Sequence, residues 1–257
     1  MRKLFVVSAW MALIAGGIYA LWVHILKPDM PRIAHAGGGL NGQTYTNSLQ
    51  ALDSSYQKGF RYFEIDLIWT KDDRLVCLHD WGKTAQRFWG YEGGEPVTLE
   101  VFNALVDSRP EITPCTLDSL NQWMRRHPGT FIITDIKDRN IEGLELVAQK
   151  IDRSHKRIIP QFYQPEEYDS VRAIGYKKMI WTLYQFTGSR EDVLEQVAPM
   201  KLFAVTMPRK RAYQGVAADL DAVRVSTYVH TINEEDRAII FHEKYFASSI
   251  YTDFLLP

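Results

Sequence analysis

The sequence has few of the features that mark several common protein classes. Its 257 residues include two cysteines, Cys77 and Cys115, and no spacing typical of a zinc or iron–sulfur site. The 30 basic and 31 acidic residues give a formal net charge of −1, so the basic excess typical of nucleic-acid binding is missing. There is also no glycine-rich nucleotide fingerprint, no repeat and no low-complexity linker. We therefore expect neither a cysteine-bound metal nor a nucleic-acid partner.

What is present is the composition of an ordinary globular protein. Hydrophobic residues make up 46% of the chain and charged residues 24%, which excludes disordered and fibrous classes. A chain of this length forms one large domain or two ordinary ones, and α/β barrels often occupy this range as a single unit. The cysteine pair fits either a disulfide in an extracytoplasmic domain or two buried thiols.

The amino terminus departs from this average. An uncharged run over residues 4–26 follows Arg2 and Lys3, and about 20 apolar residues suffice to cross a bilayer. Because the positive charges precede the run, we expect residues 1–28 to form a cytoplasmic tip and a single transmembrane anchor. Residues 29–257 would then face the periplasm or the cell exterior. A cleaved signal peptide is the alternative, although its apolar core usually has about 7–15 residues.

Short β runs alternate with longer amphipathic segments along the rest of the chain, a pattern typical of a parallel α/β fold. The pattern predicts eight strands, at residues 32–36, 61–69, 130–136, 157–163, 178–184, 201–206, 223–230 and 248–253. It predicts helices between them at residues 46–58, 117–126, 141–153, 166–174, 191–197 and 234–245.

A ninth β-like run at residues 75–79 lies close behind the strand at residues 61–69. A parallel crossover needs about a dozen residues or more, so this short connection predicts a hairpin. We interpret the run as an antiparallel arm folded back over a barrel mouth. The other eight strands match a (β/α)8, or TIM, barrel. An open doubly wound sheet is the alternative, but the nucleotide fingerprint common in such sheets is missing.

Two carboxylates, Glu64 and Asp66, stand at positions i and i+2 of an apolar run. On a strand they point to the same side, and like charges so close together are costly unless a cation neutralises them. Carboxylate oxygens favour magnesium or calcium over zinc. We therefore predict that both residues bind one divalent cation, Mg²⁺ or Ca²⁺. A half-exposed strand whose polar side meets water is the structural alternative.

Further residues provide an acid, a base and phosphate contacts. His35 and His79 lie on neighbouring segments, and histidine both accepts and donates protons near neutrality. An acid, a base and a bound cation are the groups that metal-assisted phosphodiester cleavage requires. Lys137 is a predicted phosphate ligand, because an ammonium neutralises charge that builds in the transition state. The three glycines that begin at Gly37 permit close approach of the backbone to a phosphate, or form only a turn.

These residues form an ordered pattern that consists of His35, Thr46-Asn47-Ser48, Glu64-x-Asp66, Thr70-x-Asp72-x-x-Leu75-Val76-x-x-His79-Asp80, Asp135-x-Lys137 and Thr252-Asp253. The pattern resembles that of the glycerophosphodiester phosphodiesterases, over roughly residues 31–257. The resemblance implies that both histidines are catalytic. It also implies that Asp135 is the third metal ligand, at a position where the family more often carries Glu. Asn47 corresponds to an asparagine that the family carries at the start of the first helix, and we interpret it as the cap of that helix.

The chain departs from the family pattern at two places. Ala36 stands where the family carries Arg, so a guanidinium that grips phosphate with two hydrogen bonds is lost. His230 replaces the Trp of a Trp-Thr-x-Asn motif, so we expect His230 to line the barrel mouth. Spider sphingomyelinase D proteins, remote relatives on the same barrel, also lack the Arg and carry Asp-x-Lys. The chain is similar to both groups at different positions.

The sequence therefore predicts a membrane-anchored TIM barrel that hydrolyses phosphodiesters with one divalent cation. The resemblance implies glycerophosphodiesters or lysophospholipid headgroups as substrates, in lipid metabolism. One alternative is a sphingomyelinase D-like lipid lyase. Another is a non-catalytic barrel that binds phosphorylated lipid or a partner protein, which Ala36 favours and the two histidines and the Glu64-x-Asp66 pair oppose.

Overall fold

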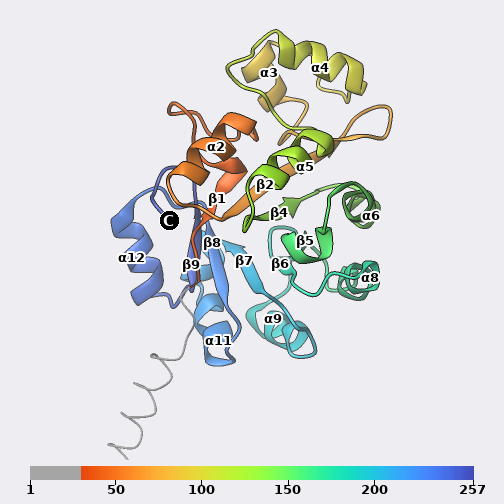
Figure 1. Ribbon diagram of the computed structural model, residues 1–257. Coiled ribbons are helices and arrows are strands. Elements are labelled where there is room, and N and C mark those ends of the chain that lie inside the picture. Colours follow the sequence, from red (N-terminus) through yellow and green to blue (C-terminus); the bar gives the residue numbers. More distant parts are fainter. Residues whose placement is uncertain (1–29) are drawn as a thin grey trace, which may run out of the picture. The chain divides into compact units, whose positions relative to one another are not determined.

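The computed structural model describes residues 30–257, in which eight parallel strands close into a barrel (Figure 1). Pairing of the first strand with both the second and the last closes the ring. Around the barrel the strands follow the order β1 (Ile33–Ala34), β9 (Ser249–Thr252), β8 (Thr227–His230), β7 (Ala204–Pro208), β6 (Ile180–Thr182), β5 (Ile158–Phe162), β4 (Phe131–Asp135) and β2 (Tyr62–Trp69). All eight overlap the predicted strands, which confirms the barrel and excludes the open sheet.

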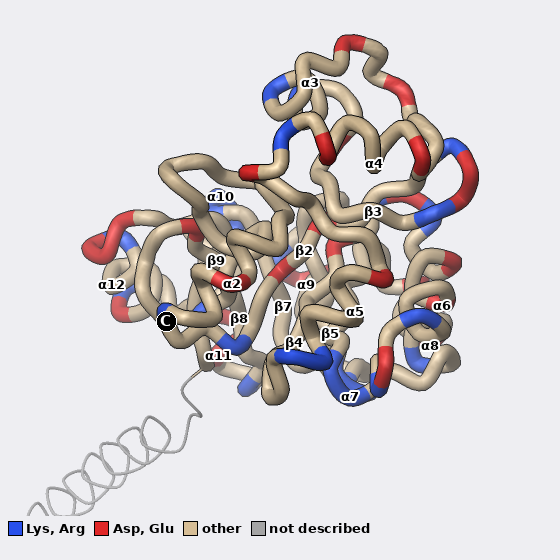
Figure 2. Tube along the Cα trace, turned by 45° about the horizontal axis from the view of Figure 1, so that its top comes forward, with Lys and Arg blue, Asp and Glu red and all other residues tan. Residues whose placement is uncertain are grey.

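Helices surround the barrel and bury its outer face. Those predicted from the sequence are α2 (Leu49–Gln57), α5 (Leu117–Arg126), α6 (Asn140–Lys150), α8 (Glu167–Ile174), α9 (Arg190–Val197) and α12 (Glu235–Glu243). Three further helices were not predicted because they are too short to show a helical period, namely α7 (Ser154–Arg157), α10 (Arg209–Tyr213) and α11 (Val216–Ala222). Residues of both charge signs lie along α6 and α12 (Figure 2), as expected for solvated outer faces.

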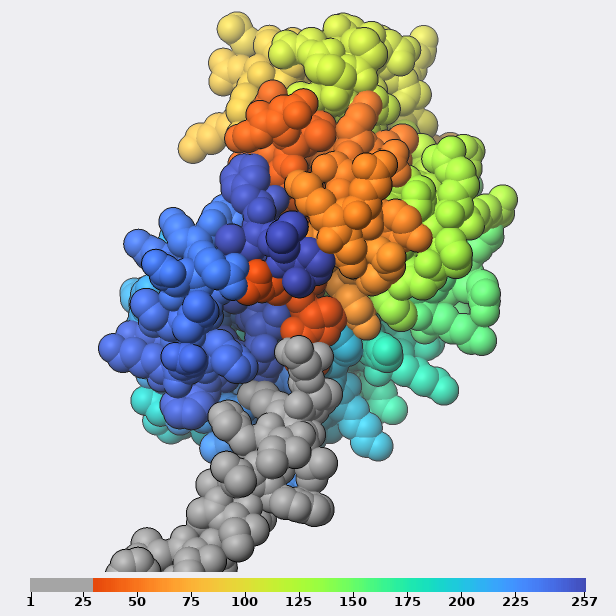
Figure 3. All heavy atoms as spheres, turned by 60° about the vertical axis from the view of Figure 1, so that its left-hand side comes forward, coloured from red at the N-terminus to blue at the C-terminus, as the bar shows by residue number. Residues whose placement is uncertain are grey.

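The two ends of the described chain lie side by side. β1 pairs with β9, and the backbone N–H of Gly39 donates to the carbonyl of Asp253. A side chain at Gly39 would overlap the ring of Phe254, with a Cβ 2.1 Å from its Cε1 atom, so only glycine fits there. Figure 3 shows the carboxyl-terminal residues packed against the start of the described chain. This contact holds the loop after β1 over the barrel mouth.

The predicted arm is present as β3 (Leu75–Cys77), which pairs antiparallel with the far end of β2. The chain then forms two helices that were not predicted, α3 (Lys83–Trp89) and α4 (Leu99–Asp107), before it returns to the barrel at α5. They enclose a small core of their own, made of Val76, Leu78, Trp81, Ala85, Phe102 and Val106. Figure 1 shows this excursion projecting beyond the barrel.

A disulfide joins the two ends of this excursion. Cys77 ends β3 and Cys115 lies two residues before the start of α5, and both side chains are fully buried. The N–H of Cys77 also donates to the carbonyl of Cys115 at 2.7 Å. Of the two possibilities that the sequence left open, the structure therefore has the disulfide.

The predicted membrane anchor at residues 1–28 lies outside the described residues. Within residues 30–257, none of the helices combines the length and the apolar character that a membrane span needs.

The disulfide should stabilise the fold by restricting the unfolded chain. Because it closes a loop of 38 residues, the double variant Cys77→Ser, Cys115→Ser should lose about 2–4 kcal/mol of unfolding free energy, measured by urea denaturation. Dithiothreitol should lower the stability of the wild type similarly and leave the double variant unaffected. A variant that unfolds at the wild-type urea concentration would show that the bond adds no stability.

Candidate active site

Three buried carboxylates meet at the barrel mouth, where the last residue of β4 lies beside the middle of β2. Asp66 lies opposite Asp135 in the strand register, and Glu64 lies two residues before Asp66 on the same side of β2. One oxygen from each of the three lies within 4.8 Å of the others, and the residues are at most 6% exposed. Phe63, which directly precedes Glu64, faces outward, with its ring 5.3 Å from that of Trp123 in α5. Alternation along β2 thus separates the charges from the core.

Within the described residues, one ammonium forms ion pairs with two of these three carboxylates. The Lys137 Nζ atom lies 3.1 Å from Asp66 and 3.5 Å from Asp135. Burial and the charge of Asp66 raise the pKa of Glu64 well above its usual range. Burial, partly opposed by Lys137 and reinforced by Asp66, raises the pKa of Asp135 to about 6. The three carboxyl groups are thus close enough to disfavour one another's ionisation, and a divalent cation would fit among their oxygens.

The remaining contacts of the three carboxylates hold them in place. Glu64 accepts a hydrogen bond from the backbone N–H of Ala36 at 2.7 Å, and Asp135 accepts one from the hydroxyl of Tyr163. Although Asp135 is shorter than the Glu common in the resembled family, it lies close enough to complete the cluster.

Asn47 has a different place from the predicted one. The cap of α2 is Ser48, whose hydroxyl accepts from the N–H of Ala51. The Asn47 amide instead donates to the Asp66 carboxylate and accepts from the Asp66 N–H, both at 2.9 Å. The capping prediction was therefore wrong by one residue, and Asn47 orients a predicted metal ligand.

His35 is held by a carboxylate from the last strand. Its Nδ1 atom lies 2.8 Å from Asp253, and the other carboxylate oxygen of Asp253 accepts from Asn233. Burial lowers the pKa of His35, but the Asp253 hydrogen bond and the charges of Glu64, Asp253 and Asp66 outweigh it and raise the pKa to about 9. The sequence placed Asp253 at a strand end but gave no sign of this pairing.

His79 reaches the same mouth from the β3 arm. Its Nδ1 atom lies 2.8 Å from Asp80, which also accepts two hydrogen bonds from Thr84. The ring of Tyr45, which the sequence did not single out, lies edge-on between the two predicted catalytic histidines, 4.7 Å from each. A carboxylate therefore orients each imidazole through Nδ1, which leaves Nε2 for chemistry.

The loop after β1 is closely packed. Gly37 has a φ of +82°, a conformation that favours glycine, and its backbone packs beside Ala51 and Leu52 of α2. Ala36 is fully buried with φ of +49°. An arginine at this position would have to displace its neighbours, so the structure has no open space here for the side chain that the family carries.

His230 ends β8 and is 8% exposed. Its Nδ1 atom lies 2.7 Å from the hydroxyl of Tyr184, while Nε2 is buried without a hydrogen-bond partner in the described part of the chain. Burial and the charge of His35 lower the pKa of His230 to about 3, so its ring is neutral. A neutral ring with one unpaired nitrogen offers a hydrogen bond to a ligand.

Solved structures of similar fold include several enzymes of one kind. A glycerophosphodiester phosphodiesterase from Thermotoga maritima is 19% identical, with a TM-score of 0.66 over 86% of this chain and 93% of that one. An Oleispira antarctica phosphodiesterase, in complex with the product sn-glycerol-3-phosphate, is 18% identical, with a TM-score of 0.65 over 88% and 94%. A glycerophosphodiester phosphodiesterase from Parabacteroides distasonis is 16% identical, with a TM-score of 0.64 over 88% and 94%.

These likenesses establish the fold, and the sequence itself establishes the family. None of the curated protein sequences matches the chain significantly. Residues 37–252 match the profile of the glycerophosphoryl diester phosphodiesterase family, and this span carries most of the pattern quoted above. The chain therefore belongs to the glycerophosphoryl diester phosphodiesterase family and is a phosphoric diester hydrolase.

Proposed function

We propose that this enzyme hydrolyses glycerophosphodiesters with the help of one divalent cation. The observation that carries the proposal is the convergence of three buried carboxylates beside two carboxylate-oriented histidines. The Oleispira antarctica relative holds sn-glycerol-3-phosphate as its product, which supports a substrate with the same glycerol phosphate group.

Glu64, Asp66 and Asp135 would hold the cation. Their oxygen donors favour Mg²⁺ or Ca²⁺, and the raised pKa values of Glu64 and Asp135 mark negative charge that a cation would offset. When bound, the cation would polarise the phosphoryl group of the substrate.

The surrounding side chains would bind the phosphate and transfer protons. The side chain of Lys137 is 41% exposed, so its ammonium can reach an equatorial phosphate oxygen without leaving the carboxylates. The unpaired nitrogen of His230 and the backbone at Gly37 are further phosphate contacts in this proposal. His35 and His79 carry the two proton transfers, one at the nucleophile and one at the leaving oxygen.

We also propose that residues 1–28 anchor the enzyme in a membrane and that the barrel works outside the cytoplasm. The Cys77–Cys115 disulfide supports this location, because such bonds persist in oxidising compartments. Protease added to intact spheroplasts should therefore digest the barrel while a cytoplasmic marker survives. A barrel cut only after lysis would mean that the domain lies inside.

Removing charge from the carboxylate cluster should abolish cation binding and catalysis. Glu64→Gln and Asp66→Asn should each lower kcat by about a hundredfold or more, because a neutral amide holds a hard cation poorly. Titration calorimetry with Mg²⁺ and Ca²⁺ should show weakened binding in both. The matched control is Asp118→Asn on the exposed face of α5, which should behave as the wild type. Undiminished turnover in EDTA would remove the cation from the mechanism.

The His35–Asp253 pair should make stability depend on pH. Since the pKa of His35 rises from 6.5 to about 9 on folding, its stabilisation is fully present below pH 6.5 and is lost as the pH rises through about 9. Asp253→Asn should lower this pKa and flatten the decline. Melting temperatures of both proteins in EDTA, from pH 6 to pH 9.5, test the prediction, with NMR titration of the His35 ring as the direct readout. The same decline in both proteins would disprove it.

A further inference from the structure

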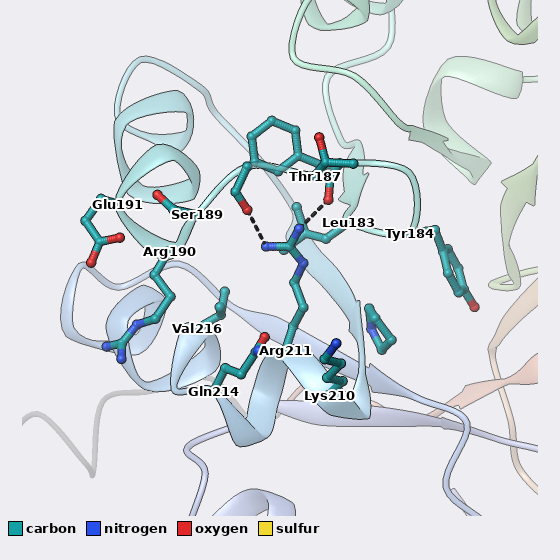
Figure 4. Close-up of a pocket in the computed structure, with 13 residues that line it drawn as sticks. Leu183, Tyr184, Thr187, Ser189, Arg190, Glu191, Lys210, Arg211, Gln214 and Val216 are labelled. Carbon is teal, nitrogen blue, oxygen red and sulfur yellow. Dashed lines mark hydrogen bonds between the residues drawn. The ribbon is translucent and has the colours of Figure 1, made fainter.

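A second cavity opens at the barrel mouth, across from the carboxylate cluster. It has a volume of about 570 Å³ and lies between the loop after β6 and the helices α10 and α11 (Figure 4). In the ring of eight strands, β6 and β7 stand opposite β1 and β2, which carry His35 and the Glu64–Asp66 pair. The cavity is larger than a glycerol moiety needs, and its size is typical of a ligand pocket.

The cationic side chains that line this cavity differ in their hydrogen-bond partners. Arg211 donates to the carbonyls of Phe186 and Gly188, as Figure 4 shows, and so fixes the loop after β6. Arg190 forms a bidentate ion pair with Asp219 of α11. Lys210 is exposed, and no side chain or carbonyl within residues 30–257 bonds its ammonium. Lys210 is therefore the cation available to a ligand in this cavity.

Tyr184 connects the cavity to His230, a proposed phosphate contact. It lines the cavity, is 50% exposed, and bonds His230 through its hydroxyl at 2.7 Å with the two rings 4.0 Å apart. In Figure 4, Tyr184 and Lys210 lie toward one end of the cavity, whereas Glu191 lies at the other. A group that extends from a phosphate near His230 past Tyr184 would meet the Lys210 ammonium first.

We propose that this cavity binds the alcohol portion of the phosphodiester and that Lys210 makes it selective for alcohols that carry an anionic group. Attraction to the ammonium favours a phosphorylated or carboxylated alcohol, while a quaternary ammonium such as choline is repelled. The exposed Gln214 amide, also without a partner in the described chain, adds hydrogen bonds for a hydroxyl-rich alcohol. The inference rests on the proposed function and names its substrate class.

The test measures kcat/KM of the full chain on three diesters that differ in the charge of the alcohol. These are glycerophosphoinositol 4-phosphate, glycerophosphoinositol and glycerophosphocholine. We expect the wild type to prefer them in that order. Lys210→Glu should shift the ratio of the first to the last by about tenfold or more in favour of choline. The control is Lys177→Glu, the same charge change at an exposed site before β6, which should keep the wild-type ratio.

A second variant tests whether the cavity holds the alcohol portion of the substrate. Thr187→Trp, on the exposed loop that borders the cavity, should lower kcat/KM for glycerophosphoinositol relative to glycerophosphomethanol, whose alcohol is too small to enter. If the wild type hydrolyses these diesters but neither variant changes the ratios, the inference is wrong and the proposed function stands. A wild-type preference for glycerophosphocholine would also overturn the inference. No turnover of any of the diesters would overturn both.

Discussion

The structure of the mouth depends on one electrostatic constraint, the crowding of three carboxylates on two adjacent strands. Asp66 and Asp135 oppose each other in the strand register, and Glu64 lies two residues before Asp66 on the same side of β2. Buried like charges of this kind require neighbours that hold and offset them. Lys137, Asn47 and the Ala36 N–H all point at this cluster.

The two predicted catalytic histidines beside this cluster are each paired with a carboxylate. Asp253 orients His35 and is itself held by Asn233, while Asp80 orients His79 and is held by Thr84. Asp253 lies 218 residues from His35 in the sequence, whereas Asp80 directly follows His79. Each carboxylate fixes a ring that would otherwise rotate. Low conformational freedom of this kind is what preorganised catalysis needs.

The sequence predicted the fold well because the relevant signals are local. Alternation along residues 61–69 and the short link to residues 75–79 suffice to predict a strand followed by an antiparallel arm, and both are present. The Glu64–Asp66 pair was predictable for the same reason, whereas Asp135, on another strand, was added by the resemblance to the family. The pairing of Asp253 with His35 was not, because 218 residues separate them. Asn47 was misassigned, because an amide next to a helix start looks like a cap until its distant partner is known.

The strand register has a consequence for how such an enzyme can change in evolution. Successive residues of β2 alternate between the mouth and the layer under α5, where Phe63 packs. Inserting or deleting one residue in β2 would turn Glu64 and Asp66 into that apolar layer and place Phe63 among the ligands. Such a change would destroy the core and the chemistry together. The loops after β6 and β7 carry no such coupling, so length variation that diversifies specificity can accumulate there while the strands stay fixed.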